Sequence, residues 1–218
     1  MTKLSRRIFI VSTAATGIAL GFGTSLLSSA RAAETIDYKT LATQLKSGGF
    51  VILVRHGATF SNQADTNPFD LSDISKQRVL NDKGKELARA FGAALRSAHV
   101  PVGKVYTSKF NRAHETAKLA GFDNIEATVD LTEGGLVVTP DENARRAKAL
   151  LSMLGQAPEK GTNTVLITHK PNVVDALGKD WFDVKEGEAS IFMPESGKYR
   201  LFARVQMDEW PKIAAAAQ

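Results

Sequence analysis

Two kinds of hydrophobic pattern alternate along this chain of 218 residues. Short runs in which every residue is apolar, such as residues 50–54 (FVILV), are typical of strands that are buried on both faces of a sheet. Longer stretches carry apolar residues three or four positions apart, as Leu87, Phe91 and Leu95 do, which is typical of amphipathic helices. The alternation of the two patterns predicts a layered α/β domain.

The same pattern, together with glycine and proline, sets the bounds of the expected elements. Strands are predicted at residues 50–54, 104–107, 125–131, 164–168, 189–193 and 199–205, and helices at 38–46, 82–96, 108–120, 139–154, 172–178 and from 208 onward. We therefore expect residues 34–218 to form one three-layer α/β/α domain with a mainly parallel mixed sheet. A polar segment at residues 57–79 is too long for a simple connection, which is typical of loops with a function.

The first 33 residues form a separate targeting pattern. Lys3, Arg6 and Arg7 precede an apolar run that contains many Gly, Ser and Thr residues, and Ala30-Arg31-Ala32 has the small residues of a cleavage site. The paired arginines resemble a twin-arginine export signal. We expect the twin-arginine export machinery to deliver the chain to the periplasm, with no stable membrane insertion after cleavage. An uncleaved membrane anchor is the alternative.

The net charge of +5 comes mostly from this targeting segment. Its four basic residues, taken from 28 Lys and Arg, leave 24 against 23 Asp and Glu in the remaining chain, a net charge of +1. This balance gives no reason to expect a nucleic-acid partner. The chain has no cysteine, which excludes disulfides and thiolate metal sites.

Basic side chains follow three of the predicted strands, at the point where each strand ends. Arg55 and His56 follow the strand at residues 50–54, and His169 follows the strand at residues 164–168. Arg112 lies in the first turn of the helix that follows the strand at residues 104–107. Because ligands bind where the carboxyl ends of parallel strands meet, we expect these side chains to converge. With no obvious carboxylate to match it, such a cluster would be costly unless an anion completed it. Phosphate is the natural candidate, since guanidinium groups bind its oxygens in pairs.

Three motifs, in order along the chain, carry a resemblance to a known family. LVRHG ends the first strand, SKFNRAHETA follows the second, and a histidine ends a later strand in THKPN. The chain from about Phe50 to Val205, including the helix sequence LNDKGKELARAFGAAL, resembles the histidine phosphatase (phosphoglycerate mutase-like) superfamily. Two positions depart from the family pattern: Ala58 replaces a polar residue after RHG, and Lys170-Pro171 replaces a glycine after the second histidine.

The resemblance implies a role for each of the basic residues. His56 is the expected nucleophile, which forms a phosphohistidine that water then hydrolyses. Arg55, Arg112 and His169, together with His56, are expected to bind the phosphate and to stabilise its charge during transfer. The neighbouring cations should also keep the imidazole of His56 neutral, which is the form that attacks. No metal and no other cofactor is expected.

A carboxylic acid is needed to protonate the leaving group, and the sequence offers three candidates. Glu133 in DLTEGG lies where the smaller phosphatases of this superfamily often place their acid. Glu188, just before a later strand, is the second candidate, and Asp175, on the helix after His169, is the third. Each of them, taken alone, would more often be a solvated surface carboxylate.

Together these observations favour an exported phosphomonoesterase that acts on a phosphorylated small molecule through a phosphohistidine. Two alternatives stay open: a phosphatase for phosphohistidine in proteins, and a non-catalytic periplasmic phosphate-binding protein that has the basic cluster but no working acid.

Overall fold

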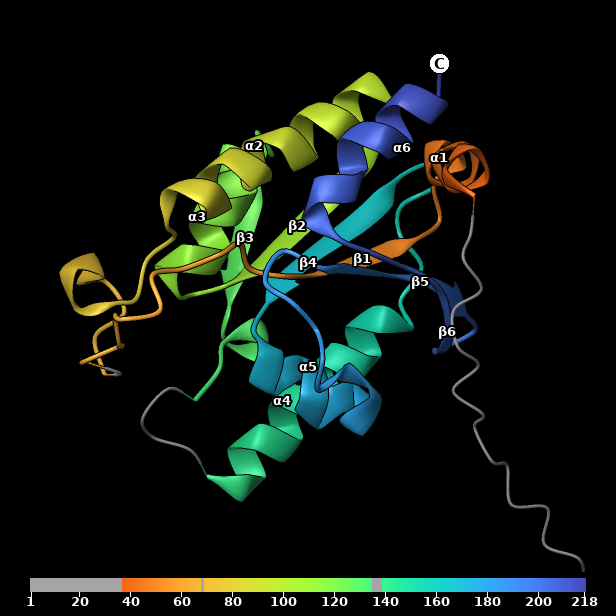
Figure 1. The fold of residues 1–218 in the computed structure, drawn as a ribbon. Helices are drawn as coiled ribbons and strands as arrows, with labels where there is room; N and C mark the ends of the chain where they lie inside the picture. The colour runs from red at the N-terminus through yellow and green to blue at the C-terminus, as the bar shows by residue number, and fades with distance from the viewer. Residues whose placement is uncertain (1–36, 68, 135–138) are drawn as a thin grey trace, which may run out of the picture. The chain divides into compact units, whose positions relative to one another are not determined.

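The computed structural model describes residues 37–67, 69–134 and 139–218, which contain a six-stranded sheet of order β3-β2-β4-β1-β5-β6 (Figure 1). The strands are β1 (Val51–Arg55), β2 (Val102–Ser108), β3 (Ile125–Thr128), β4 (Asn163–Thr168), β5 (Ala189–Glu195) and β6 (Lys198–Val205). Neighbours among β3, β2, β4 and β1 are parallel, whereas β5 pairs antiparallel with β1, and β6 antiparallel with β5. The expected mainly parallel mixed sheet is confirmed.

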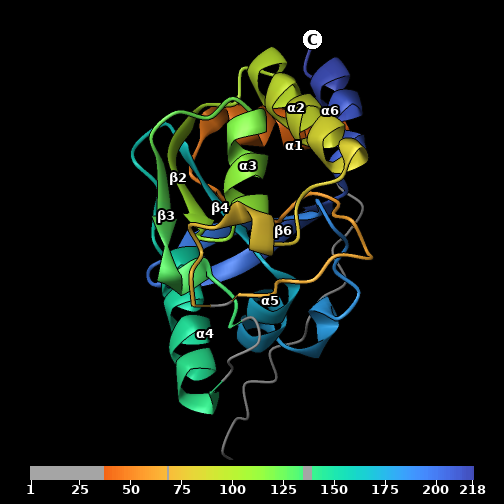
Figure 2. The same ribbon diagram turned by 90° about the vertical axis from the view of Figure 1, so that its left-hand side faces the viewer.

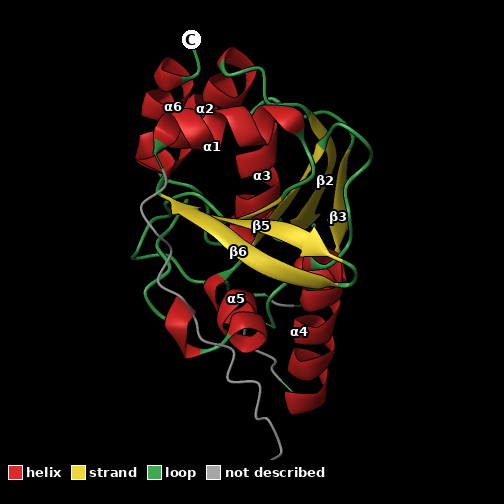
Figure 3. Ribbon diagram, turned by 90° about the vertical axis from the view of Figure 1, so that its right-hand side faces the viewer, coloured by secondary structure: helices red, strands yellow, loops and turns green. Residues whose placement is uncertain are grey.

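Helices cover both faces of this sheet. One face carries α1 (Tyr38–Ser47), α2 (Asp82–Ser97), α3 (Asn111–Leu119) and α6 (Trp210–Ala216), and the other carries α4 (Pro140–Leu154) and α5 (Lys170–Leu177). Figures 2 and 3 show the same division from two sides. The expected α/β/α layering is therefore present.

Each face of the sheet has its own hydrophobic core, because successive side chains of a strand point to opposite faces. In β1, Ile52 and Val54 belong to the core with α1, α2, α3 and α6, and Val51 and Leu53 belong to the core with α4 and α5. All four side chains are at most 2% exposed. Burial on both faces explains why every residue of this strand up to its end is apolar.

Several element bounds differ from the predictions, and two of the differences have clear local reasons. β3 ends at Thr128, because the Thr128 hydroxyl accepts a hydrogen bond from the Asp130 amide (3.2 Å) and a 3-10 turn, Val129–Leu131, replaces the last predicted strand residues. α5 begins at Lys170, two residues earlier than predicted, and Pro171 occupies its first turn. Proline is favourable there because the first helical amides need no intrahelical partner.

The predicted loop at residues 57–79 is attached to the domain by specific contacts. Thr59 and Leu80 form an isolated β-bridge across its ends. Gln77 is 5% exposed, and its side chain donates to the Leu71 carbonyl (2.7 Å) and accepts from the Asn111 amide (2.8 Å). The loop is thus held against the first turn of α3, where the predicted Arg112 lies.

The described part of the chain begins with Asp37, whose carboxylate accepts hydrogen bonds from the Lys39 and Thr40 amides and caps α1. The expected export signal at residues 1–33 lies outside the described residues. Among the helices that the structure describes, none has the length and apolar composition needed to cross a membrane.

Candidate active site

The predicted basic residues meet at the carboxyl ends of three adjacent parallel strands. Arg55, the last residue of β1, is in register with Thr168, the last residue of β4, so His56 and His169 follow side by side. The centres of the two imidazole rings are 5.1 Å apart. Arg112 reaches the same place from the first turn of α3, which follows β2 on the other side of β4. The structure therefore brings together all four residues.

His56 is fixed in one orientation and one protonation state. It is 1% exposed, and its backbone amide donates to the Thr168 carbonyl of the neighbouring strand (3.0 Å). Its Nδ1 lies 2.8 Å from the Gly57 carbonyl, which can only accept, so Nδ1 carries the proton and Nε2 has a free lone pair. Burial, with smaller contributions from His169 and Arg112, holds the pKa of His56 well below its usual value of 6.5. The ring is therefore neutral near pH 7.

Arg112 is the most thoroughly bonded side chain of the site. It is fully buried, and its guanidinium lies 4.3 Å from the centre of the Phe110 ring. Nε donates to His169 Nδ1 (3.3 Å), one terminal nitrogen donates to Asp65 (2.9 Å), and the other donates to Glu133 in a short contact. The expectation that this cluster has no matching carboxylate is wrong, because Asp65 and Glu133 both bind Arg112.

The hydrogen bonds of His169 determine its tautomer. Its Nδ1 accepts from Arg112, so its Nε2 carries the proton and donates to the Ser108 hydroxyl (2.7 Å). Burial first, and then the charge of Arg112, hold the pKa of His169 well below its usual value of 6.5. Glu133 Oε1 also lies 3.2 Å from Nδ1. Both atoms accept hydrogen bonds from the guanidinium of Arg112, which holds them close together.

Arg55 is less completely bonded than Arg112. One terminal nitrogen donates to the Val184 carbonyl (2.8 Å), and the other lies 3.7 Å from Glu186. The Gly187 amide donates to the carbonyls of both Arg55 and His56 (3.0 and 2.9 Å), which fixes the end of β1. Within residues 37–67, 69–134 and 139–218, the buried Nε–H of Arg55 finds no hydrogen-bond acceptor. A buried donor without a partner is unfavourable, so this group is available for an anion.

Part of the chain is similar to a known protein family. Residues 51–136 match the histidine phosphatase superfamily, branch 1. The match includes all of LVRHG and all of SKFNRAHETA, two of the three motifs on which the expected resemblance rests. No curated protein sequence matches the chain.

Several solved structures share the fold of most of the described domain. The protein histidine phosphatase SixA, solved with tungstate, is 19% identical, with a TM-score of 0.52 over 73% of this chain and 98% of its own. Phosphoserine phosphatase from Entamoeba histolytica, in complex with 3-phosphoglyceric acid, is 18% identical, with a TM-score of 0.52 over 72% and 98%. YhfR from Bacillus stearothermophilus is 20% identical, with a TM-score of 0.50 over 70% and 94%. These likenesses establish the fold.

The structure separates the two main candidates for the acid. Glu133 contacts both Arg112 and His169, as described above, and its side chain is 14% exposed. Glu188 is 2% exposed, and its carboxylate accepts from Arg204 (2.5 Å) and Gln206 (2.8 Å). The carboxylate of Glu188 is therefore occupied by structural contacts, whereas Glu133 lies among the converging basic residues.

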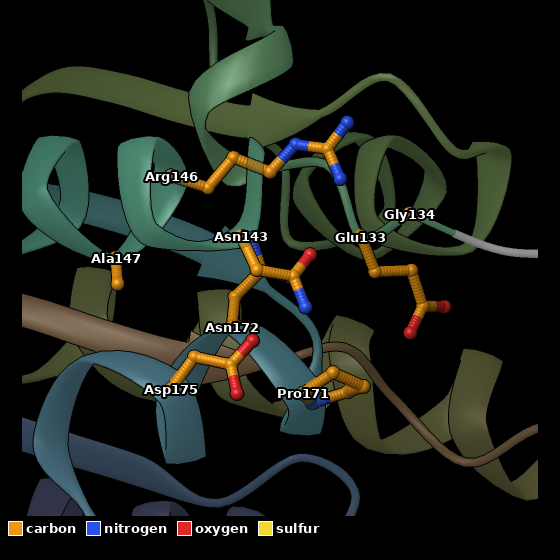
Figure 4. Close-up of a pocket in the computed structure, with 8 residues that line it drawn as sticks. All are labelled: Glu133, Gly134, Asn143, Arg146, Ala147, Pro171, Asn172 and Asp175. Carbon is orange, nitrogen blue, oxygen red and sulfur yellow. The ribbon is translucent and has the colours of Figure 1, made fainter. Parts of the chain in front are cut away.

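Asp175, the third candidate, lies beside Glu133 at a pocket between α4 and α5. Figure 4 shows the residues of this pocket, with Glu133 at one end, Arg146 above and Asp175 below. Lys170, which departs from the family pattern, does not line this pocket; its ammonium lies 5.7 Å from the centre of the Phe182 ring.

Sequence reasoning missed the roles of Asp65 and Glu186 in this site. Both lie in connecting segments, where acidic residues are usually solvated, and Asp65 is separated from Arg112 by 47 positions. A possible signal was the length of the segment at residues 57–79, but nothing in it distinguishes Asp65 from its acidic neighbours. Among the described residues, no group of three or more His, Asp and Glu side chains could hold a metal ion.

Proposed function

We propose that this protein is a phosphatase that hydrolyses phosphomonoesters through a phosphohistidine on His56. The observation that carries the proposal is the state of that ring: Nδ1 is fixed by Gly57 and the neutral Nε2 keeps its lone pair. Two arginines and a second histidine surround it. The match to the histidine phosphatase superfamily supports the same chemistry. So do the names of SixA and of the Entamoeba phosphoserine phosphatase.

In the proposed first step, the Nε2 lone pair of His56 attacks phosphorus, and the bond between phosphorus and the ester oxygen breaks. The leaving oxygen takes a proton from Glu133 and departs as an alcohol. In the second step, water attacks phosphorus and gives a proton back to the Glu133 carboxylate. The P–N bond breaks, its electron pair returns to Nε2, and inorganic phosphate leaves.

Arg55 and Arg112 would bind the phosphoryl oxygens in different ways. The buried Nε–H of Arg55 has no acceptor in the described chain and would gain one in phosphate. Arg112 already donates to Asp65 and Glu133, so a phosphoryl oxygen must share or replace one of those contacts. Hydrogen bonds to a charged group are worth about 1.5–3 kcal/mol each, so a few such bonds suffice for binding.

The acid role of Glu133 is supported by its position, because it contacts both Arg112 and His169 and borders the pocket beside the basic residues. Burial and the charge of Arg112 disfavour protonation of His169, whose pKa they lower. His169 is therefore neutral and a poor proton donor, which leaves Glu133 as the group to protonate the leaving oxygen.

Release of phosphate from p-nitrophenyl phosphate by the purified protein tests the proposal. Replacing the nucleophile in His56→Ala should lower the rate by about a thousandfold or more, since loss of a nucleophile removes nearly all chemical catalysis. The matched control is His99→Asn: His99 is exposed and has a positive φ of 53°, which asparagine tolerates. The control should retain the wild-type rate. Equal rates for wild type and His56→Ala would support the non-catalytic phosphate-binding alternative.

A phosphatase for phosphohistidine in proteins is the second candidate function. It is favoured by exposed apolar side chains in the loop at residues 57–79, because they could contact a protein surface: Phe69 is 85% exposed and Ile74 is 49% exposed. A phosphorylated histidine-containing domain and a panel of small phosphomonoesters should be compared as substrates. Faster turnover of the domain, with a slower rate for Phe69→Ser on the domain alone, would favour this candidate.

We further propose that residues 1–33 direct export to the periplasm by the twin-arginine machinery. Replacing Arg6 and Arg7 together by lysine should leave the protein in the cytoplasm and uncleaved, because lysine lacks the planar guanidinium of the paired arginines. Cell fractionation and the intact mass of the protein measure both effects. An unchanged distribution would contradict the proposed route.

A further inference from the structure

A pocket between α4 and α5 adjoins the proposed acid Glu133 (Figure 4). It encloses about 60 Å³, and because one water needs about 10–15 Å³ measured in this way, it takes a group of about four to six non-hydrogen atoms. Glu133 belongs to both this pocket and the phosphoryl site. A leaving group whose oxygen meets Glu133 therefore has this pocket directly beside it.

Arg146, on α4, has a guanidinium group with few partners among the described residues. Its side chain is 17% exposed, and in the described residues its buried Nε makes no hydrogen bond. The nearest carboxylate is Glu142, at 3.3 Å, but both oxygens of Glu142 accept hydrogen bonds from Arg145 (2.7, 2.9 and 3.1 Å). A guanidinium that is largely removed from water and weakly paired is suited to an added anion.

The opposite wall of the pocket, on α5, has complementary chemistry. Asp175 contributes a carboxylate, and no ion pair joins it to Arg146 or to any other described residue. Asn172 is 2% exposed, and its side-chain amide nitrogen donates a hydrogen bond to the Thr132 carbonyl (3.4 Å). Its side-chain oxygen stays available as an acceptor. A group bound here meets a cation on one side, and an anion with a neutral acceptor on the other.

We propose that this pocket binds the head group of an amino-acid leaving group, so that the substrate is a phosphomonoester of a small hydroxy amino acid; this rests on the phosphatase function proposed above. The substrate's α-carboxylate binds Arg146, and its ammonium binds Asp175 and the Asn172 oxygen. The carboxylate, the α-carbon and the ammonium nitrogen amount to about five non-hydrogen atoms, which fits the volume of the pocket.

Four alkyl phosphates separate the two charges of the head group. Phosphoserine has both charges, 3-hydroxypropionate phosphate has the carboxylate, phosphoethanolamine has the ammonium, and ethyl phosphate has neither. For the wild type we expect kcat/KM to be highest for phosphoserine and lowest for ethyl phosphate. Each charge should contribute about ten- to a hundredfold, the range of a hydrogen bond between charged groups.

Variants of Arg146 and Asp175 show which residue causes the preference for the carboxylate and which causes the preference for the ammonium. Arg146→Gln should remove the preference for the carboxylate and keep that for the ammonium, whereas Asp175→Asn should do the reverse. Arg146→Lys should restore part of the carboxylate preference, because it keeps the charge without the planar guanidinium. Lys148→Gln, on α4, and Asp180→Asn remove exposed charges of the same signs that do not line the pocket, and both should keep the wild-type preferences.

The outcomes distinguish this inference from the proposed function. If p-nitrophenyl phosphate is hydrolysed by a His56-dependent reaction but the four alkyl phosphates react alike, the pocket does not bind an amino-acid head group. The same conclusion follows if the preferences survive in Arg146→Gln and Asp175→Asn. If p-nitrophenyl phosphate itself is not hydrolysed, the phosphatase function fails, and this inference fails with it.

Discussion

Two buried clusters in this chain combine an arginine with a glutamate and differ in what surrounds them. The active-site cluster is His56, Arg112, Glu133 and His169, at the carboxyl ends of β1, β2 and β4. The strand-edge cluster is Glu188, Arg204 and Gln206, near β5 and β6 at the other side of the sheet. Both contain an arginine–glutamate ion pair, so the pairing alone does not indicate which of them takes part in chemistry.

The two clusters differ in how many hydrogen bonds the carboxylate of the glutamate accepts. In the strand-edge cluster both oxygens of Glu188 accept from side chains, and one of them also accepts from the Lys185 amide (3.2 Å). In the active-site cluster Glu133 accepts from Arg112 alone among the described residues, lies 3.2 Å from His169 Nδ1 and borders a pocket. An ion pair whose carboxylate has all its hydrogen-bond partners stabilises one structure. An ion pair whose carboxylate has fewer partners and borders a pocket can exchange protons and bind ligands.

The largest expected effect separates the two glutamates by activity. Glu133→Gln should lower kcat on alkyl phosphates by about a hundred- to ten-thousandfold, because an alkoxide needs a proton to leave. The loss on p-nitrophenyl phosphate should be much smaller, since its leaving group is stable as an anion. Steady-state kinetics on both substrates measure the difference. Equal losses on the two would show that Glu133 is not the acid.

The next effect separates the two glutamates by stability. Glu188→Ala leaves Arg204 and Gln206 without their acceptor and should lower the free energy of unfolding by about 2–4 kcal/mol. That is less than for a wholly buried pair, because the Arg204 side chain is 25% exposed. Urea denaturation measures the change. A loss below about 1 kcal/mol would mean that the strand-edge cluster behaves as a surface ion pair.

A smaller effect depends on pH and arises in the active-site cluster but not in the strand-edge cluster, which has no histidine; His114, whose pKa is also lowered by burial, adds a contribution of the same sign in every variant. The folded protein keeps His56 and His169 neutral because burial lowers both pKa values below 6.5. Below about pH 6.5 the unfolded chain therefore binds more protons than the folded chain, and stability falls as pH falls, by up to about 1.4 kcal/mol per pH unit for each histidine.

Thermal unfolding of His169→Gln between pH 5 and 8 tests this linkage. One of the two contributions should disappear, so the loss of stability below about pH 6.5 should be shallower than in the wild type. The exposed control His99→Asn should keep the wild-type dependence. A variant curve parallel to the wild-type curve would contradict the lowered pKa of His169.

The smallest expected effect concerns an exposed ion pair at the tip of the β5–β6 hairpin. Glu195 and Arg200 are 2.9 Å apart, but their side chains are 51% and 54% exposed. Glu195→Ala should therefore change the free energy of unfolding by less than about 1 kcal/mol. Urea denaturation of Glu195→Ala and Glu188→Ala under the same conditions compares the two losses of unfolding free energy. The difference between them shows how much of the loss in Glu188→Ala is due to burial.

The sequence predicted the basic half of the site and missed most of the acidic half. Arg55, His56 and His169 each follow an apolar run directly, so their positions depend on a local pattern and on the rule that parallel strands end at one edge. Asp65 and Glu186 lie in connecting segments whose paths depend on tertiary packing. No periodicity specifies which of their carboxylates turns toward an arginine.

For the fold, the sequence predicted the strands and helices but not all of their bounds. The strands and helices were found because burial imposes periods of two and of 3.6 residues on the sequence. The start of α5 and the end of β3 were misplaced by two or three residues, because they depend on single contacts of Pro171 and Thr128. Such contacts change the backbone path without changing the hydrophobic pattern.

The two imidazoles are attached to the central strands of the sheet, and this attachment has a consequence for how the protein loses activity. The amide of His56 donates to Thr168 across β1 and β4, which lie in the middle of the strand order. The most protected amides of a domain exchange with solvent only when the whole domain unfolds. Deuterium uptake at residue 56 should accordingly be as slow as in the hydrophobic core, and heating should abolish the chemistry and the fold in a single cooperative transition.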